Sequence, residues 1–208
     1  MAFERPAADI DDARSPAAAL DLYWIPRGAG NRVVQFSGRT FESVVARRDH
    51  RPPCDIYHSA LVATLGSDRY FVEMTPVPSP RAVSDRGVVG GGAVGTRWAA
   101  RLRIFRYEIR CWRNGIIPDL HHAIDGPVEL TRDESVVRAA LDAVRSVPTP
   151  TWGRDELRAG EMWNSNSVIA WVLAVTGLDA HAGEPPDPGR APGWDAGITI
   201  AGRRASPR

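Results

Sequence analysis

The segment Trp163-Asn164-Ser165-Asn166 precedes an almost wholly apolar stretch, residues 168–175. Apolar residues at this density predict a buried helix from Ser167 to about Thr176, with Gly177 at its end. The N–H groups and dipole at a helix start stabilise a developing oxyanion, which suits a nucleophile such as Ser165. Ser and Asn are also the favoured helix caps, worth about 1 kcal/mol each. Two interpretations therefore stay open, a nucleophile with its oxyanion hole and a helix cap.

His58 could supply the general base for such a nucleophile. It lies in a β-rich segment, 56–65, which turn residues separate from a second β-rich segment, 70–75. If the turn has an even number of residues, Glu73 shares a sheet face with His58, because side chains alternate along a strand. A carboxylate beside an imidazole holds its tautomer and stabilises its cation. The alternatives are a structural histidine and a Glu73 that pairs with an arginine or lies on a solvated face.

The order of these two motifs resembles the permuted papain-like proteins, which include the lecithin:retinol acyltransferase-like and PPPDE-type families. The segment Tyr57-His58-Ser59-Ala60-Leu61-Val62 resembles their histidine strand, and Asn164-Ser165-Asn166-Ser167-Val168-Ile169 resembles their nucleophile helix. Ser165 stands where those families have cysteine. The resemblance implies an α+β fold of the circularly permuted papain-like type, a small antiparallel sheet packed against a few helices.

The resemblance further implies a hydrolase or acyltransferase that acts on an amide, ester or thioester. Its catalytic residues would be Ser165, His58 and Glu73, and its oxyanion and substrate-binding residues Asn164, Asn166, Trp163 and Tyr57. A serine gains less than a cysteine from a helix dipole and needs an active base. The alternative is therefore a catalytically inactive papain-like binding or accessory protein that retains the cleft, with arginines recognising an anionic partner.

Arginines concentrate in one stretch, at Arg101, Arg103, Arg106 and Arg110. They could bind a phosphate or a carboxylated ligand, or form a solvated sheet face paired with acids such as Glu108. All 26 basic residues are arginine, which excludes lysine chemistry, and the formal net charge is only +1. Such a small net charge argues against nucleic acid as the main partner. The expected partner is a small-molecule or acyl/peptidyl substrate.

Nothing in the sequence predicts a cofactor or a metal. Cys54 and Cys111 make no disulfide framework, and His121-His122 lacks a recognised ligand spacing. The run Gly90-Gly91-Gly92 lacks the ending of a phosphate loop and is expected to be a flexible loop. No stretch approaches the roughly 20 apolar residues of a membrane span, and the start lacks signal-peptide features. The expected location is cytoplasmic.

One domain is expected over residues 17–202, with flexible termini at 1–16 and 203–208. Thr131-Arg132-Asp133-Glu134 matches a capping box before a helix that extends to Val144. The other expected elements are strands at 20–26, 32–36, 98–112 and 197–201, and a helix at 41–48.

Overall fold

The computed structural model describes residues 17–26, 50, 54–77, 86–180 and 183–205. Within them, six strands form one antiparallel sheet in the order β4-β5-β3-β2-β1-β6. The strands are β1 Ala18–Pro26, β2 Tyr57–Leu65, β3 Asp68–Pro76, β4 Val88–Ala93, β5 Arg106–Arg113 and β6 Val128–Thr131. The helices are α2 Glu134–Val144, α3 Ser165–Val175 and α4 Trp194–Ala205, with short turns η1 Arg97–Arg101, η2 Arg103–Phe105 and η3 Leu120–His122. The α+β class, an antiparallel sheet with a few helices, is confirmed.

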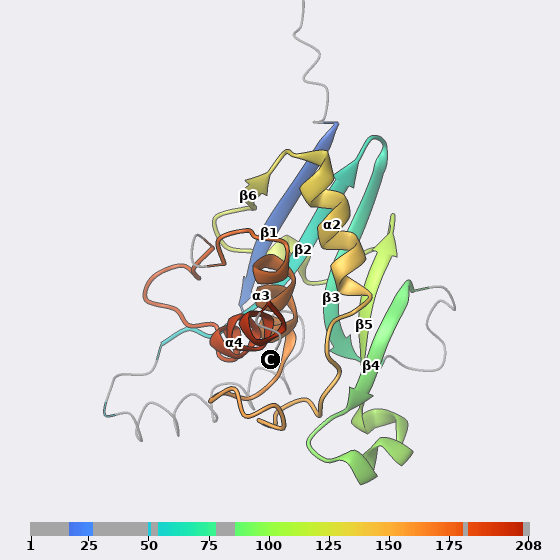
Figure 1. Ribbon diagram of the computed structural model, residues 1–208, viewed down its shortest axis with the longest axis vertical. Coiled ribbons are helices and arrows are strands. Elements are labelled where there is room, and N and C mark those ends of the chain that lie inside the picture. Colours follow the sequence, from blue (N-terminus) through green and yellow to red (C-terminus); the bar gives the residue numbers. More distant parts are fainter. Residues whose placement is uncertain (1–16, 27–49, 51–53, 78–85, 181–182, 206–208) are drawn as a thin grey trace, which may run out of the picture.

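Helices cover one face of this sheet, here called the helix face. Helices α2 and α3 pack against the central strands, and α4 packs against α3 (Figure 1). The main core lies between them and contains alternate strand residues such as Leu61 and Val72 together with Trp171. Because strand side chains alternate, the intervening positions point to the other side, the far face. There a smaller cluster gathers Ile25, Ala60, Val62, Phe71 and Ile117.

The central hairpin follows the predicted pattern. Strands β2 and β3 pair with Leu65 opposite Asp68, so the turn between them is Gly66–Ser67. Gly66 has a φ of 59°, a left-handed conformation that glycine adopts without steric cost. The predictions of strands at 20–26, 56–65 and 70–75 are confirmed, with shifts of one or two residues at their ends.

Helix α2 also forms where it was expected, but with a different cap. The carboxylate of Asp133 accepts hydrogen bonds from the backbone of Ser135 (2.8 Å) and Val136 (3.4 Å). Thr131, the first residue of the predicted capping box, instead ends β6, and its hydroxyl accepts a bond from the Asp133 N–H (3.0 Å). The predicted box was therefore wrong by two residues.

Three other predictions were wrong. The glycine run is the middle of β4 and not a flexible loop. A Cβ at Gly91 would lie 2.6 Å from the carbonyl oxygen of Tyr107, so only glycine fits beside β5. The strand expected at 98–112 begins only at Arg106, because residues 97–105 form η1 and η2. The strand expected at 197–201 belongs to α4, which continues to Ala205 and so into the terminus expected to be flexible.

The expected strand at 32–36, the helix at 41–48 and the flexible segment 1–16 lie outside the described residues. Among the helices that the structure does describe, none has the length and apolar character that a bilayer crossing needs.

Candidate functional site

The start of α3 is a fully formed helix cap. The side-chain oxygen of Asn164 accepts hydrogen bonds from the backbone of Asn166 (2.9 Å) and Ser167 (3.4 Å). In turn, the Ser167 hydroxyl accepts a hydrogen bond from the Asn164 N–H (3.0 Å), which completes a capping box. The Asn164 amide also donates to the carbonyl of Pro192 (2.7 Å), and the Ser167 hydroxyl donates to that of Gly193 (2.7 Å). These contacts attach the loop that precedes α4 to the start of α3.

Asn166 links the same helix to strand β2. Its oxygen accepts from both the N–H (2.8 Å) and the hydroxyl (3.0 Å) of Ser59. Its nitrogen donates to the carbonyls of Tyr57 (3.0 Å) and Pro192 (3.0 Å). Since a side-chain amide has two donors and two acceptor lone pairs, these four bonds use its whole capacity. Asn166 is 3% exposed and acts as a structural link. The two segments of the predicted site thus do lie in contact.

His58, however, is directed away from α3. In the pairing of β1 with β2, His58 is opposite Ile25 and Ser59 is opposite Trp24. Directly opposed residues point to the same side of a sheet. Ile25 belongs to the far-face cluster and Trp24 to the helix-face core. The register therefore places the His58 side chain on the far face.

Ser165 begins α3 on the helix face, where it is 7% exposed. The sheet lies between it and the His58 side chain. This arrangement does not bring the predicted nucleophile and base together. A general base must reach its proton within hydrogen-bond distance or through one water.

Glu73 is held by an arginine. Its carboxylate accepts a hydrogen bond from the Arg110 guanidinium (2.9 Å), directly across the β3–β5 pairing. Burial raises the pKa of Glu73, and Arg110 opposes this shift without cancelling it. The arginine-partner interpretation of Glu73 is the one that this contact supports.

Tyr57 and Trp163, expected to bind substrate, both lie in the helix-face core and are 7% and 2% exposed. Gly189 packs directly on the Tyr57 ring, where a Cβ atom would collide with it. The residue after Gly189 also bonds to β2, since the Tyr57 N–H donates to the carbonyl of Arg190 (2.9 Å). Both aromatic side chains therefore support packing around the start of α3.

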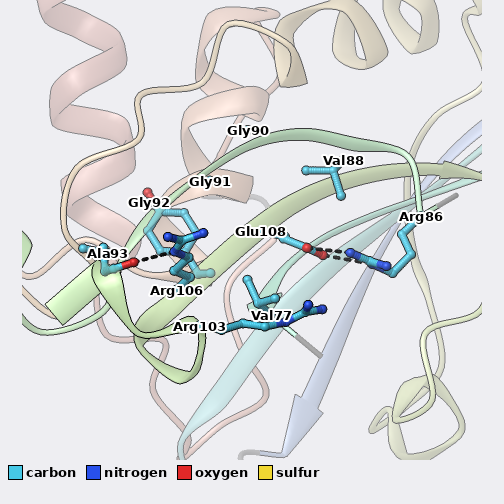
Figure 2. Close-up of a pocket in the computed structure, with 12 residues that line it drawn as sticks. Val77, Arg86, Val88, Gly90, Gly91, Gly92, Ala93, Arg103, Arg106 and Glu108 are labelled. Atoms are coloured by element: carbon cyan, nitrogen blue, oxygen red, sulfur yellow. Dashed lines mark hydrogen bonds and ion pairs between the residues drawn. The ribbon is translucent and has the colours of Figure 1, made fainter. Parts of the chain in front are cut away.

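A hollow of about 610 Å³ lies instead beside β4 and β5 (Figure 2). We call it the arginine groove. Three arginines and one glutamate are its charged lining residues among those described. The lining consists of Val77, Arg86, Val88, Gly90, Gly91, Gly92, Ala93, Ala100, Arg103, Arg106, Tyr107 and Glu108.

Two of the lining residues, Arg86 and Glu108, belong to a chain of ion pairs. Glu108 accepts hydrogen bonds from Arg86 through Nε (3.2 Å) and Nη2 (2.8 Å), drawn as dashed lines in Figure 2. It also accepts from Arg110 through Nε (3.2 Å) and Nη2 (3.1 Å), and Arg110 continues to Glu73. Burial raises the pKa of Glu108, but the bonds from the two arginines outweigh it and hold the pKa below its usual value. An ionised Glu108 thus orients Arg86 at the groove wall.

Part of this groove is visible in the sequence and the rest is not. The arginine-rich stretch was noticed, and Arg106 and Arg110 do share a strand with Glu108. Arg86 and the glycines were missed, because their role depends on the pairing of β4 with β5. A short glycine run next to a valine pair, Val88-Val89, was the only local sign of that strand.

No protein-family model, curated protein or solved structure matches this chain. Nor does the described part of the chain contain a group of three His, Cys, Asp or Glu side chains that could hold a metal ion.

Glu156, the partner of Arg97, provides a test of the acid stability of the fold. It accepts hydrogen bonds from Arg97 (2.9 and 3.0 Å) and from the N–H (3.0 Å) and hydroxyl (2.8 Å) of Thr151. The bonds from Arg97, followed by those from Thr151, lower the pKa of Glu156 to about 2. A carboxyl whose pKa is lower in the folded state stabilises the protein above its unfolded pKa, and loses that contribution as the pH falls.

We therefore expect the Glu156→Gln variant to lose less stability than the wild type as the pH falls from 4.5, the ordinary value, to about 2. Urea unfolding at a series of pH values measures this difference. The Thr151→Val variant, which lacks one donor to the carboxylate, should lose an amount of stability between those of the wild type and Glu156→Gln. Identical acid dependence in wild type and Glu156→Gln would show that these bonds do not persist in solution.

Proposed function

We propose that this protein is a non-catalytic binding protein whose arginine groove holds a small anionic ligand. The observation that carries the proposal is the composition of the lining, whose described residues bring the guanidinium groups of Arg86, Arg103 and Arg106 to one hollow. Guanidinium groups match the geometry of phosphate and carboxylate groups and bind them through paired hydrogen bonds. An anion of either kind is therefore a suitable ligand for this lining.

The size and the order of the groove support the same proposal. Its volume of about 610 Å³ lies in the usual range for small-molecule sites, about 300 to 1,000 Å³. Glycines 90–92 leave the β4 wall without side chains, so backbone sets its shape. Arg103 extends along the groove toward the side where Arg86 and Glu108 lie (Figure 2). A site whose charged groups are already oriented loses less entropy on binding.

We also propose that the scaffold is of the circularly permuted papain-like type and has lost, or never had, the catalytic pairing. The supporting observation is the contact of the histidine strand with the start of α3 through Asn166 and Ser59. The hydrolase or acyltransferase with Ser165 as nucleophile stays a prediction. It is less well supported than the binding proposal, because the register directs His58 away from Ser165.

The binding proposal predicts that a multivalent anion will raise the melting temperature of the protein at low salt. Suitable probes are inorganic phosphate, pyrophosphate and citrate, because ligands that bind only the folded state stabilise it. We expect Arg103→Gln to weaken the binding of the best probe about tenfold or more, since hydrogen bonds to charged groups contribute about 1.5–3 kcal/mol. Isothermal titration calorimetry measures the change.

The matched control is Arg138→Gln, which removes an exposed arginine of α2 that pairs with Glu134. It should leave the affinity unchanged. The proposal is overturned if none of the three anions binds, or if Arg103→Gln and Arg138→Gln both bind like the wild type.

A further inference from the structure

Residues 97–106 form a projection that extends beyond the end of β4 (Figure 1). It contains η1 and η2 and carries four large apolar side chains that face solvent. These are Trp98 (73% exposed), Leu102 (56%), Ile104 (75%) and Phe105 (38%). Within the described residues, half of the exposed large hydrophobic side chains lie in these ten positions. Single exposed apolar residues are ordinary on a protein surface, but a contiguous group indicates an interaction site.

Arginines alternate with these apolar side chains. The projection contains Arg97, Arg101, Arg103 and Arg106 and has no Asp or Glu. Arg97 pairs with Glu156 at the base, whereas Arg101, in η1, is exposed to solvent. A surface that combines exposed Trp, Leu, Ile and Phe with arginine complements an anionic bilayer. The apolar groups enter the acyl boundary, and each nearby arginine is attracted by the lipid phosphates.

The base of the projection is well anchored. Arg154 donates to the carbonyl of Gly95 (2.7 Å), and the Gly95 N–H donates to the carbonyl of Trp152 (2.9 Å). Ala99, inside η1, is 4% exposed and packs inward. The turn that carries the apolar side chains is therefore attached to the rest of the protein at its base.

We propose that this projection docks the protein on the surface of an anionic lipid bilayer. Its size favours a bilayer over a protein partner, because a stable protein interface takes about 20–30 residues from each side. The formal net charge of +1 disfavours nucleic acid, which binds through a broad basic surface. The inference does not depend on the anion-binding function of the groove.

Flotation with vesicles of phosphatidylglycerol and phosphatidylcholine tests the proposal, with pure phosphatidylcholine vesicles for comparison. We expect the wild type to bind the anionic vesicles and to bind them less as salt increases. The double variant Trp98→Ser/Ile104→Ser should bind at least about tenfold more weakly, because apolar burial is lost. Ile116→Ser, at a residue that is 70% exposed outside the projection, is the matched control and should bind like the wild type.

The charge component is tested by Arg101→Gln, which changes an exposed arginine of η1 that does not line the groove. It should weaken binding about fivefold, while Arg145→Gln, after α2, should have no effect. Failure of the wild type to bind anionic vesicles would overturn the proposal, as would unchanged binding of the double variant. Sedimentation velocity without vesicles tests for self-association. Self-association that the double variant abolishes would also overturn the proposal, because the projection would then be a contact between copies.

Discussion

Replacing Asn166 by alanine should lower the free energy of unfolding by about 4 kcal/mol. The change removes all four hydrogen bonds of a side chain that is 3% exposed. It leaves the Ser59 N–H and the carbonyls of Tyr57 and Pro192 without this partner, and each buried unpaired group costs about 1–3 kcal/mol. Urea unfolding followed by circular dichroism measures the loss.

The matched control is Ser165→Ala in the same turn of the helix. We expect it to cost less than about 1 kcal/mol, because alanine is the best helix former and differs from serine by one atom. An Asn166→Ala variant as stable as the wild type would contradict the structural role of this segment. A Ser165→Ala variant as damaged as Asn166→Ala would also contradict it.

Replacing Arg110 by methionine should cost about 4 kcal/mol at neutral pH. Arg110 is 7% exposed and holds both Glu73 and Glu108, which are 9% and 8% exposed. Removing Arg110 takes away the arginine that Glu73 pairs with, while Glu108 keeps Arg86, and breaking a buried ion pair in this way costs about 3–5 kcal/mol. On the same strand, Arg113→Met is the control. Arg113 forms an exposed pair with Asp68, so its loss should cost less than about 1 kcal/mol.

The cost of Arg110→Met should also depend on pH. Burial already raises the pKa of Glu73, and removing Arg110 takes away the main influence that lowers it. A carboxyl with a raised pKa in the folded state favours folding at low pH, and this contribution is lost as the pH rises through that pKa. The variant should therefore become less stable relative to the wild type as the pH rises from 4.5. A cost that stays constant between acidic and neutral pH, or equals that of Arg113→Met, would contradict the buried network.

The β2–β3 hairpin, α2 and α3 could be predicted because their signals are local. Turn residues, apolar spacing and a C-terminal glycine are visible in a short window. Gly177 does end α3, with a φ of 76° and a bond from the Leu178 N–H to the Leu173 carbonyl (3.1 Å).

Elements that depend on distant contacts could not be predicted in this way. By themselves the glycines of β4 suggest a loop. Their close contact with Tyr107, which explains why glycine is needed there, is visible only in the structure. Likewise Gly197 with Ile198, Thr199 and Ile200 suggests a strand, but Gly197 lies where α4 closely approaches the carbonyl of Ser167 on α3. In both places glycine allows a close approach of two elements, which the local sequence does not show.

The candidate site shows the same limit. The sequence suggested that His58 and the start of α3 face each other, whereas in the structure it is Ser59 of that strand that contacts Asn166. Which side chain of the strand faces the helix depends on register, since a shift of one residue exchanges the two faces of a strand. Ser59 faces α3 and His58 faces the opposite side. No motif in a single sequence contains this information.

Hydrogen–deuterium exchange of the full chain locates the ligand directly. The exchange is measured without ligand and then with the anion that binds most tightly among phosphate, pyrophosphate and citrate. We predict slower exchange on binding in residues 86–93 and 103–108, which line the arginine groove. Residues 57–59 and 163–168, around the start of α3, should exchange at the same rate in both states. Protection of residues 57–59 and 163–168 without protection of the groove would contradict the account, and would place the ligand at the predicted papain-like site.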